Sequence, residues 1–157
     1  MGITYLMQSG CDSISTNPPE YRCWTEDYPN GSIYEGPSVS PGNEMFDYVW
    51  NNGNQTTTYY IYNLTTGQYT SFTNSSPYVG YRAANCINEK LGAYLPNFGS
   101  TYMWDCGTVD SSNNTYKLTS GNNDMYTMVN GSTGQTIDAP GSVDGNNGFW
   151  LTWYGTG

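Results

Sequence analysis

The chain has 157 residues and contains no histidine. Lysine and arginine total 4 against 13 aspartates and glutamates, which gives a formal net charge of −9 at pH 7. The missing histidine excludes Ser-His-Asp triads, Cys-His dyads and the usual histidine-containing zinc sites. The negative charge argues against nucleic acid and anionic membranes as partners. A chain of this length is expected to form one domain, spanning residues 1–157.

Only 11% of the residues are charged, and most of the polarity comes from Asn, Thr, Ser, Gly and Tyr. Hydrogen bonding by these residues hardly changes in the acidic pH range. An even number of cysteines, 4 here, is typical of disulfide-containing proteins outside the cytosol. We therefore expect a secreted protein in an acidic environment, without membrane insertion, because no apolar run approaches the length of a membrane span. The N-x-S/T sequons, candidates for glycosylation, begin at Asn30, Asn54, Asn63, Asn74, Asn113 and Asn130.

Short runs rich in Tyr, Thr, Val, Ile and Trp alternate with clusters of Gly, Pro, Asn and Ser along the whole chain, a pattern typical of strands joined by turns. The predicted strands are 3–9, 20–26, 44–50, 56–62, 68–72, 80–88, 99–105, 115–118, 124–129 and 148–154. The strands at 56–62 and 68–72 are expected to form an antiparallel hairpin, because Gly67 suits a positive φ in the turn. The sequence thus predicts an all-β fold in which two antiparallel sheets form a sandwich.

Five short segments carry the most specific signal, and they occur in a fixed order. They read LMQSG at 6–10, YRCWTEDYPN at 21–30, GPSVSPGN at 36–43, YNLTTGQ at 62–68 and ANCINE at 84–89. In this order they resemble motifs of the glutamic peptidase family (eqolisins, peptidase family G1). The corresponding family patterns are I-L-Q-T-G, Y-x-A-W-Y-E-W-Y-P-D, G-x-x-I-S-A-G-D, E-N-x-T-T-G-Q and A-E-W-I-V-E. The resemblance extends over essentially the whole chain.

The resemblance implies an eqolisin-like, concanavalin A-like sandwich and an acid endopeptidase that cleaves polypeptides without a cofactor or metal. It places the catalytic pair at Gln8 and Glu89. It also implies that Trp24, Glu26 and Tyr28 line the substrate groove. An aspartate four residues after the glutamine, here Asp12, is implied to hold the glutamine side chain.

The chemistry of such a pair follows from its functional groups. The Glu89 carboxylate would act as general base on a water molecule and return the proton to the leaving amine. The Gln8 amide would donate a hydrogen bond to the developing oxyanion.

The chain also departs from the family. Cys86 stands where the family has a tryptophan, Asn85 and Asn88 replace an acidic and an apolar residue, and Arg22 replaces an aspartate. An Arg22 side chain near Glu89 would lower the pKa of that carboxyl and weaken it as a base. The family segments that precede the glutamine are also absent from this sequence. An open sheet edge is therefore expected, filled by a light chain or by a neighbouring subunit.

Three function classes stay open, with the glutamic endopeptidase ranked first. The second is a catalytically inactive eqolisin-like subunit of an extracellular fibre or coat, which completes its sheet with a partner strand. The third is a carbohydrate-binding β-sandwich, motivated by the aromatic content. Hairpin order favours disulfides between Cys11 and Cys23 and between Cys86 and Cys106, one of three connectivities.

Overall fold

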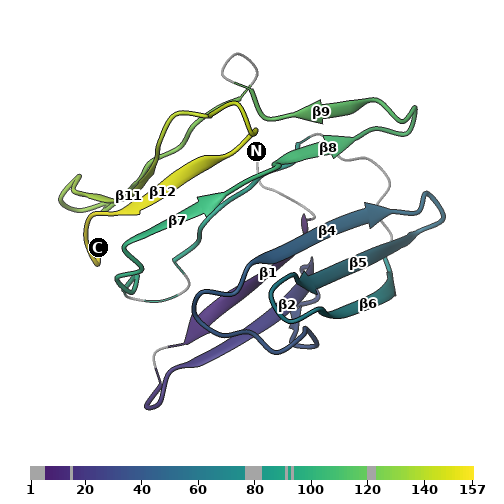
Figure 1. The fold of residues 1–157 in the computed structure, drawn as a ribbon, viewed down its shortest axis with the longest axis horizontal. Coiled ribbons are helices and arrows are strands. Elements are labelled where there is room, and N and C mark those ends of the chain that lie inside the picture. The colour runs from purple at the N-terminus through teal and green to yellow at the C-terminus, as the bar shows by residue number, and fades with distance from the viewer. Residues whose placement is uncertain (1–5, 15, 77–82, 91, 93, 120–122) are drawn as a thin grey trace. The chain divides into compact units, whose positions relative to one another are not determined.

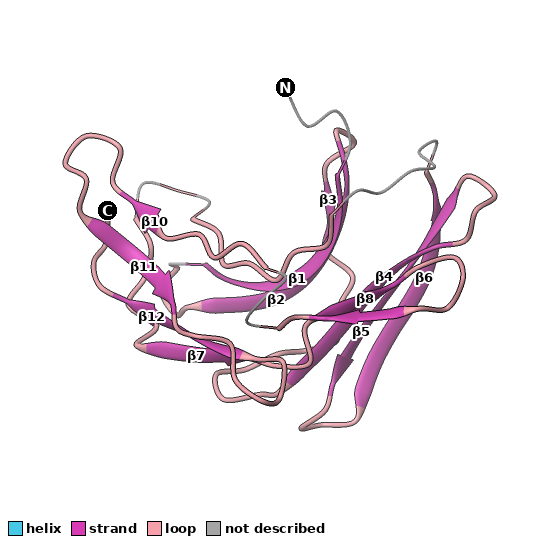
Figure 2. Cartoon of the chain, turned by 90° about the horizontal axis from the view of Figure 1, so that it is seen from above, coloured by secondary structure: helices cyan, strands magenta, loops and turns pink. Residues whose placement is uncertain are grey.

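The computed structural model describes residues 6–14, 16–76, 83–90, 92, 94–119 and 123–157. These residues form antiparallel strands and loops, with no helix among them (Figures 1 and 2). The chain divides into two compact units, Met1–Gly80 and Tyr81–Gly157. The predicted all-β, antiparallel fold is confirmed.

The first unit contains two sheets of three strands each. One sheet has the order β1-β2-β3 (Figure 2), and the other has the order β4-β5-β6 (Figure 1). The strands are β1 (Leu6–Ile14), β2 (Glu20–Tyr28), β3 (Ser32–Ile33), β4 (Met45–Asn51), β5 (Thr56–Asn63) and β6 (Gln68–Ser75). The predicted hairpin is β5–β6, and Gly67 in its turn has a φ of 75°.

The interface between these two sheets contains several hydrogen-bonded polar side chains. The β5 side chains alternate strictly, and Thr57, Tyr59, Ile61 and Asn63 are buried on the side that faces β1 and β2. The Thr57 hydroxyl donates to the sulfur of Met7 on β1, and the Tyr59 hydroxyl donates to Asp27 on β2 over 2.5 Å. Because buried polar groups are costly without partners, these bonds stabilise the packing of the two sheets.

The second unit has a four-stranded sheet in the order β10-β11-β12-β7 and a separate β8-β9 hairpin. The strands are β7 (Ser100–Met103), β8 (Gly107–Val109), β9 (Thr115–Lys117), β10 (Met128–Val129), β11 (Thr136–Pro140) and β12 (Phe149–Trp153). Its hydrophobic cluster consists of Cys106, Phe149 and Leu151, packed against Phe98, Met103 and Leu118.

Several strand predictions need correction. The predicted strand 124–129 shrinks to Met128–Val129, and β3, β8 and β11 were not predicted. Residues 83–88 of the predicted strand 80–88 are not in a strand, and residues 80–82 lie outside the described residues, as do 3–5 of the predicted strand 3–9. The two asparagines at 85 and 88 disfavour a strand. The Asn88 side chain instead donates to Asp138 on β11 over 2.7 Å.

Two turns repeat one sequence pattern, Asn-x-Ser/Thr-Thr-Gly-Gln, at 63–68 and 130–135. The Asn63 side-chain oxygen accepts from the backbone N–H groups of residues 65 and 66, both at 3.1 Å. The Asn130 oxygen accepts from residues 132 and 133 at 2.9 and 3.1 Å. Asn side chains stabilise turns in this way. The same type of Asn-stabilised turn therefore joins β5 to β6 in the first unit and β10 to β11 in the second.

Candidate active site

One face of the β1–β2 hairpin gathers five of the residues predicted for the site. β1 pairs with β2 so that Gln8 lies opposite Glu26, Gly10 opposite Trp24 and Asp12 opposite Arg22. Side chains alternate along a strand. Met7 and Ser9 contact β5 and β4, so the even-numbered side chains point away from that interface. Residues of this face predicted for the site are Gln8, Asp12, Trp24, Glu26 and Tyr28.

The side chains of Gln8 and Glu26 are hydrogen-bonded. The Gln8 Nε2 donates to the Glu26 Oε2 over 2.7 Å, and both side chains are half-buried. A bond to a carboxylate is stronger than one between neutral groups. This bond therefore fixes the orientation of the Gln8 amide.

Asp12 has a different partner from the one expected. The Arg22 guanidinium donates to Asp12, with 3.1 Å between Nε and Oδ1. The hydrogen bond to Asp12 raises the pKa of Arg22, while burial opposes this effect. The Arg22 Cζ also lies 3.6 Å from the centre of the Tyr34 ring. The sequence predicted that Asp12 holds the Gln8 side chain. In the structure Gln8 instead donates to the carboxylate of Glu26, and Asp12 accepts from Arg22.

Trp24 lies against Gly10 at the centre of this face. A Cβ atom added at Gly10 would lie 3.5 Å from Trp24 Cζ2, so the ring covers the glycine. The Trp24 indole nitrogen is buried and has no hydrogen-bond partner among the described residues. Tyr28 is 48% exposed at the end of β2. The face thus combines a fixed amide, a carboxylate, an aromatic wall and an accessible hydroxyl.

Glu89 lies in the second unit and lines an open pocket of about 530 Å³. It belongs to the loop 83–90, which the Asn88–Asp138 bond ties to β11. The other lining residues are Asn88, Lys90, Met128, Val129, Asn130, Gly131, Ile137 and Gly157. Glu89 is therefore accessible to a ligand. Since Gln8 and Glu89 belong to different units, their pairing stays a prediction.

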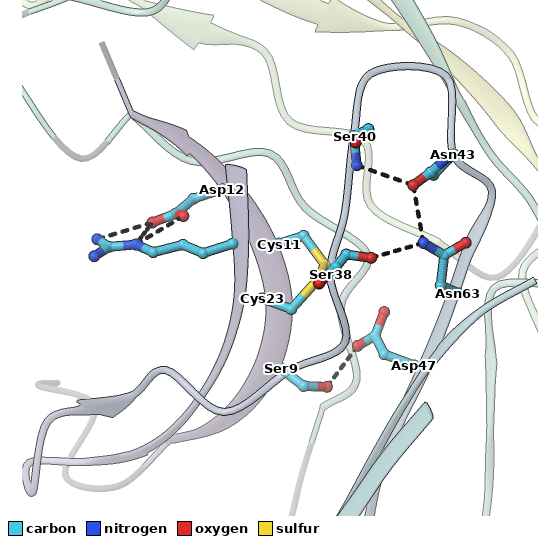
Figure 3. The surroundings of a disulfide bond; sticks show 10 residues. Ser9, Cys11, Asp12, Cys23, Ser38, Ser40, Asn43, Asp47 and Asn63 are labelled. Atoms are coloured by element: carbon cyan, nitrogen blue, oxygen red, sulfur yellow. Dashed lines mark hydrogen bonds and ion pairs between the residues drawn. A yellow bond between two sulfur atoms is a disulfide. The ribbon is translucent and has the colours of Figure 1, made fainter. Parts of the chain in front are cut away.

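The disulfide predicted between Cys11 and Cys23 is confirmed, with an S–S distance of 2.01 Å (Figure 3). The two cysteines are directly paired on β1 and β2, and Figure 3 shows Asp12 on the other side of the strands. The Cys86–Cys106 disulfide stays a prediction. Cys86 is exposed and Cys106 is buried.

Close approach of the chain to this disulfide depends on Gly36. A Cβ atom at Gly36 would lie 2.2 Å from the Cβ of Cys23. This distance is far inside van der Waals contact, so the segment after β3 passes Cys23 only because residue 36 has no side chain.

The six sequons differ in accessibility. Asn63 has 0% exposed surface. Its amide donates to the Ser38 carbonyl and to Asn43 Oδ1, each over 2.9 Å (Figure 3). The Asn63 amide is therefore inaccessible in the folded protein, which argues against this candidate as a glycan acceptor. Asn30, Asn54 and Asn113 are exposed, whereas Asn74 and Asn130 are half-buried.

Sequence reasoning missed two features of the site. Glu26 was expected to line the groove, but its bond to Gln8 was not foreseen. A hairpin register pairing 8 with 26 would have indicated it. Lys90 was not considered, although it adjoins Glu89 in the chain and lines the same pocket. The described residues contain no group of three or more metal-ligating side chains. They also contain no helix long and apolar enough to cross a membrane.

These features define an antiparallel β-sandwich protein that carries an ordered glutamine-glutamate pair on one sheet face. The model of the Peptidase A4 family matches residues 2–152, and the chain belongs to this family of glutamic peptidases. The resemblance found in the sequence motifs is thereby confirmed.

Solved structures share the fold. Aspergilloglutamic peptidase from Aspergillus niger superposes with a TM-score of 0.78 at 19% identity, covering 96% of this chain and 91% of that one. Scytalido-glutamic peptidase with a peptide-based transition state analogue gives a TM-score of 0.69 at 16% identity, covering 96% and 76%. A search of curated proteins gave no match. The family assignment supports a peptidase function in general, and the solved structures support the β-sandwich fold.

Proposed function

We propose that the protein is an acid-acting glutamic endopeptidase in which Gln8 and Glu89 form the catalytic pair. The observation that carries the proposal is the Gln8–Glu26 hydrogen bond of 2.7 Å. In a chain that belongs to a peptidase family, this bond presents an oriented amide beside Trp24 and Tyr28. An amide nitrogen carries two hydrogens, so one can bind Glu26 while the other donates to a substrate oxygen.

The mechanism requires only groups that the chain contains. The Glu89 carboxylate takes a proton from water, and the oxygen of that water attacks the carbonyl carbon of the scissile peptide. The second N–H of Gln8 stabilises the negative charge on the carbonyl oxygen. The C–N bond then breaks, and Glu89 returns its proton to the leaving amine. Trp24 would contact apolar substrate side chains, and the Tyr28 hydroxyl would bind the substrate backbone.

We also propose an extracellular, acidic setting. The Cys11–Cys23 disulfide and the small share of charged residues, 11%, support it. Glycans would be carried by the exposed sequons Asn30, Asn54 and Asn113. A light chain or a strand from a neighbouring subunit would complete the groove. Mass spectrometry of the secreted protein identifies both the glycans and a co-purifying chain.

The test is cleavage of a denatured protein substrate between pH 2 and 7. The wild type is expected to cleave only in acid. Glu89→Gln and Gln8→Ala are each expected to lose activity by about 100-fold or more, the usual effect of removing an oxyanion donor or a general base. Glu35→Gln and Gln68→Ala change exposed residues of the same types and are expected to keep activity.

Two results would contradict the proposal. One is a folded wild-type protein that cleaves nothing at any pH, alone or with its natural partner chain. The other is acid cleavage that both Glu89→Gln and Gln8→Ala leave unchanged.

A further inference from the structure

The outer side of the β4–β6 sheet, which faces away from β1 and β2, carries a continuous aromatic and hydroxyl surface. Residues paired across the three strands share this side, as in the row Phe46, Tyr62 and Tyr69 and the row Tyr48, Tyr60 and Ser71. We call this side the aromatic face. Its members are Phe46, Tyr48, Trp50, Thr56, Thr58, Tyr60, Tyr62, Tyr69, Ser71, Thr73 and Ser75.

The rings of the aromatic face form an ordered cluster. Tyr48 and Tyr60 stack with centroids 5.2 Å apart and planes at 16°, and Tyr60 stacks on Tyr69 at 5.5 Å and 24°. This stack of Tyr48, Tyr60 and Tyr69 crosses all three strands, which lie side by side in Figure 1. Mutual stacking holds the rings in place. Binding of a ligand to them therefore costs little conformational entropy of the tyrosine side chains.

The cluster is open to solvent. Tyr69 is 64% exposed, Trp50 45% and Tyr48 42%. Beyond the rings, the hydroxyls of Thr58 and Thr73 lie 2.8 Å apart, and Asn52 donates to Thr58. An ordered strip of hydroxyl groups therefore continues the row of rings along the same surface.

The chemistry of the aromatic face restricts its partner. None of its members is Asp, Glu, Lys or Arg, so it offers no ion pair to a phosphate, a nucleic acid or an acidic polymer. It also lacks Leu, Ile, Val and Met. Protein interfaces are enriched in aromatics together with Met and Arg, and this surface has only the aromatics. Rings next to neutral hydroxyls match a sugar, whose C–H groups pack on rings and whose hydroxyls exchange hydrogen bonds.

We propose that the aromatic face is a binding surface for an uncharged polysaccharide. Gln8 lies on the opposite side of the same unit, on the face of β1–β2 that points away from β4–β6. A polysaccharide on the aromatic face thus leaves the Gln8 face accessible. The inference does not depend on the proposed peptidase activity, since the two surfaces share no residue.

The lack of charged side chains on the aromatic face predicts how its binding depends on pH and salt. Tyrosine, threonine and serine do not ionise between pH 3 and 7. Binding is therefore expected to have the same affinity across this pH range and to be insensitive to salt, although the protein as a whole loses its negative charge in acid.

The experiment is co-sedimentation of the full chain with insoluble cellulose, chitin and β-1,3-glucan, and with calcium polygalacturonate as an anionic comparison, followed by calorimetry with the matching hexasaccharides. Tyr48→Ala and Tyr69→Ala are each expected to weaken binding about five- to tenfold, and the variant with Tyr48, Tyr60 and Tyr69 all replaced by alanine is expected to abolish it. Tyr94→Ala and Tyr126→Ala are the matched controls, because these tyrosines are 71% and 80% exposed outside this face. Circular dichroism verifies that each variant is folded.

Binding that the Tyr48 and Tyr69 variants lose, that the controls keep and that is constant from pH 3 to 7 supports the proposal. Three results would overturn it: no binding of the wild type to any of the polysaccharides, equal loss in the control variants, or binding only to polygalacturonate, an anionic polymer. A dimer that Tyr48→Ala dissociates, in the absence of glycan binding, would instead assign the aromatic face to self-association.

Discussion

Gln8 and Glu26 occupy directly paired positions of β1 and β2, and the amide of the first donates to the carboxylate of the second over 2.7 Å. A strand pair is a rigid support for such a bond, because the backbone ladder fixes both Cα positions. We therefore propose Glu26 as a positioning residue for the oxyanion donor, whereas the sequence alone indicated a groove residue.

The first prediction concerns this role. Glu26→Gln is expected to lower kcat about 10- to 100-fold with little change in KM, because a misplaced catalytic group slows the chemical step. Steady-state kinetics with a peptide substrate at acidic pH measures both constants. Glu20→Gln, on the exposed opposite end of β2, is the control. A rise in KM at unchanged kcat would assign Glu26 to substrate binding.

The second prediction concerns the contact between Gly36 and Cys23. Gly36→Ala is expected to lower the free energy of unfolding by about 1–3 kcal/mol or more, because the added methyl group would overlap the Cys23 Cβ. Urea denaturation of the oxidised protein measures the loss. Gly53→Ala is unsuitable as a control because of its positive φ. Gly131→Ala, where nothing lies within 4 Å of the new atom, should have a much smaller effect.

The third prediction uses the repeated turns. Asn63→Asp removes a buried amide that donates to Ser38 and Asn43, leaving acceptors without a donor, and is expected to cost about 1–3 kcal/mol. Asn130→Asp keeps the turn's side-chain acceptor in a half-buried setting and is expected to cost much less. Thermal unfolding compares the two. Equal losses would show that the turn, and not the burial of Asn63, dominates. Peptide mapping should also find residue 63 without a glycan.

The fourth prediction concerns acid stability. Partial removal of the Asp47 carboxyl from water raises its pKa above the usual value, although the residue as a whole is exposed, and the hydrogen bond from Ser9 only partly opposes this shift. The folded protein then binds more protons than the unfolded chain just above pH 3.8, the model value for this group. The Asp47 contribution to stability is therefore fully present below pH 3.8 and declines as the pH rises through the folded-state pKa.

Asp47→Asn is accordingly expected to raise the free energy of unfolding near pH 7 and to change that free energy little near pH 3. Asn can still accept a hydrogen bond from Ser9. Urea denaturation at several pH values measures this difference, with Asp124→Asn, at an exposed position, as the control. A variant less stable than the wild type at pH 7 would show that the Ser9 bond to the charged carboxylate outweighs the cost of burial.

The sequence predicted the longest hairpins well. The β5–β6 pair follows from two runs rich in Thr, Tyr and Ile and from Gly67, whose positive φ closes the turn. The Cys11–Cys23 bond follows from hairpin order. In both cases the information is local, since it lies in adjacent strands and the turn between them.

Features that depend on distant residues were not predictable in this way. β3 consists of Ser32 and Ile33 and exists only because β2 pairs with it, while β11 ends in Pro140 and reads as a loop by composition. Nothing in the sequon at Asn63 signals that Ser38 and Asn43 surround it. The same limit applies to the pairing of Arg22 with Asp12 on the adjacent strand, which the sequence did not indicate.

The Cys11–Cys23 bond also has a consequence for which side chain the β1 strand presents. In a strand, a register slip of one residue exchanges the two faces, so a shifted β1 would present Met7 in place of Gln8. The covalent link three positions away from Gln8 forbids that slip, so it preserves the identity of the proposed catalytic face as well as stability. Reduction of the disulfide removes this covalent restraint, and the register of β1 then depends on its ladder with β2 and on the contacts of Met7 and Ser9 with β5 and β4.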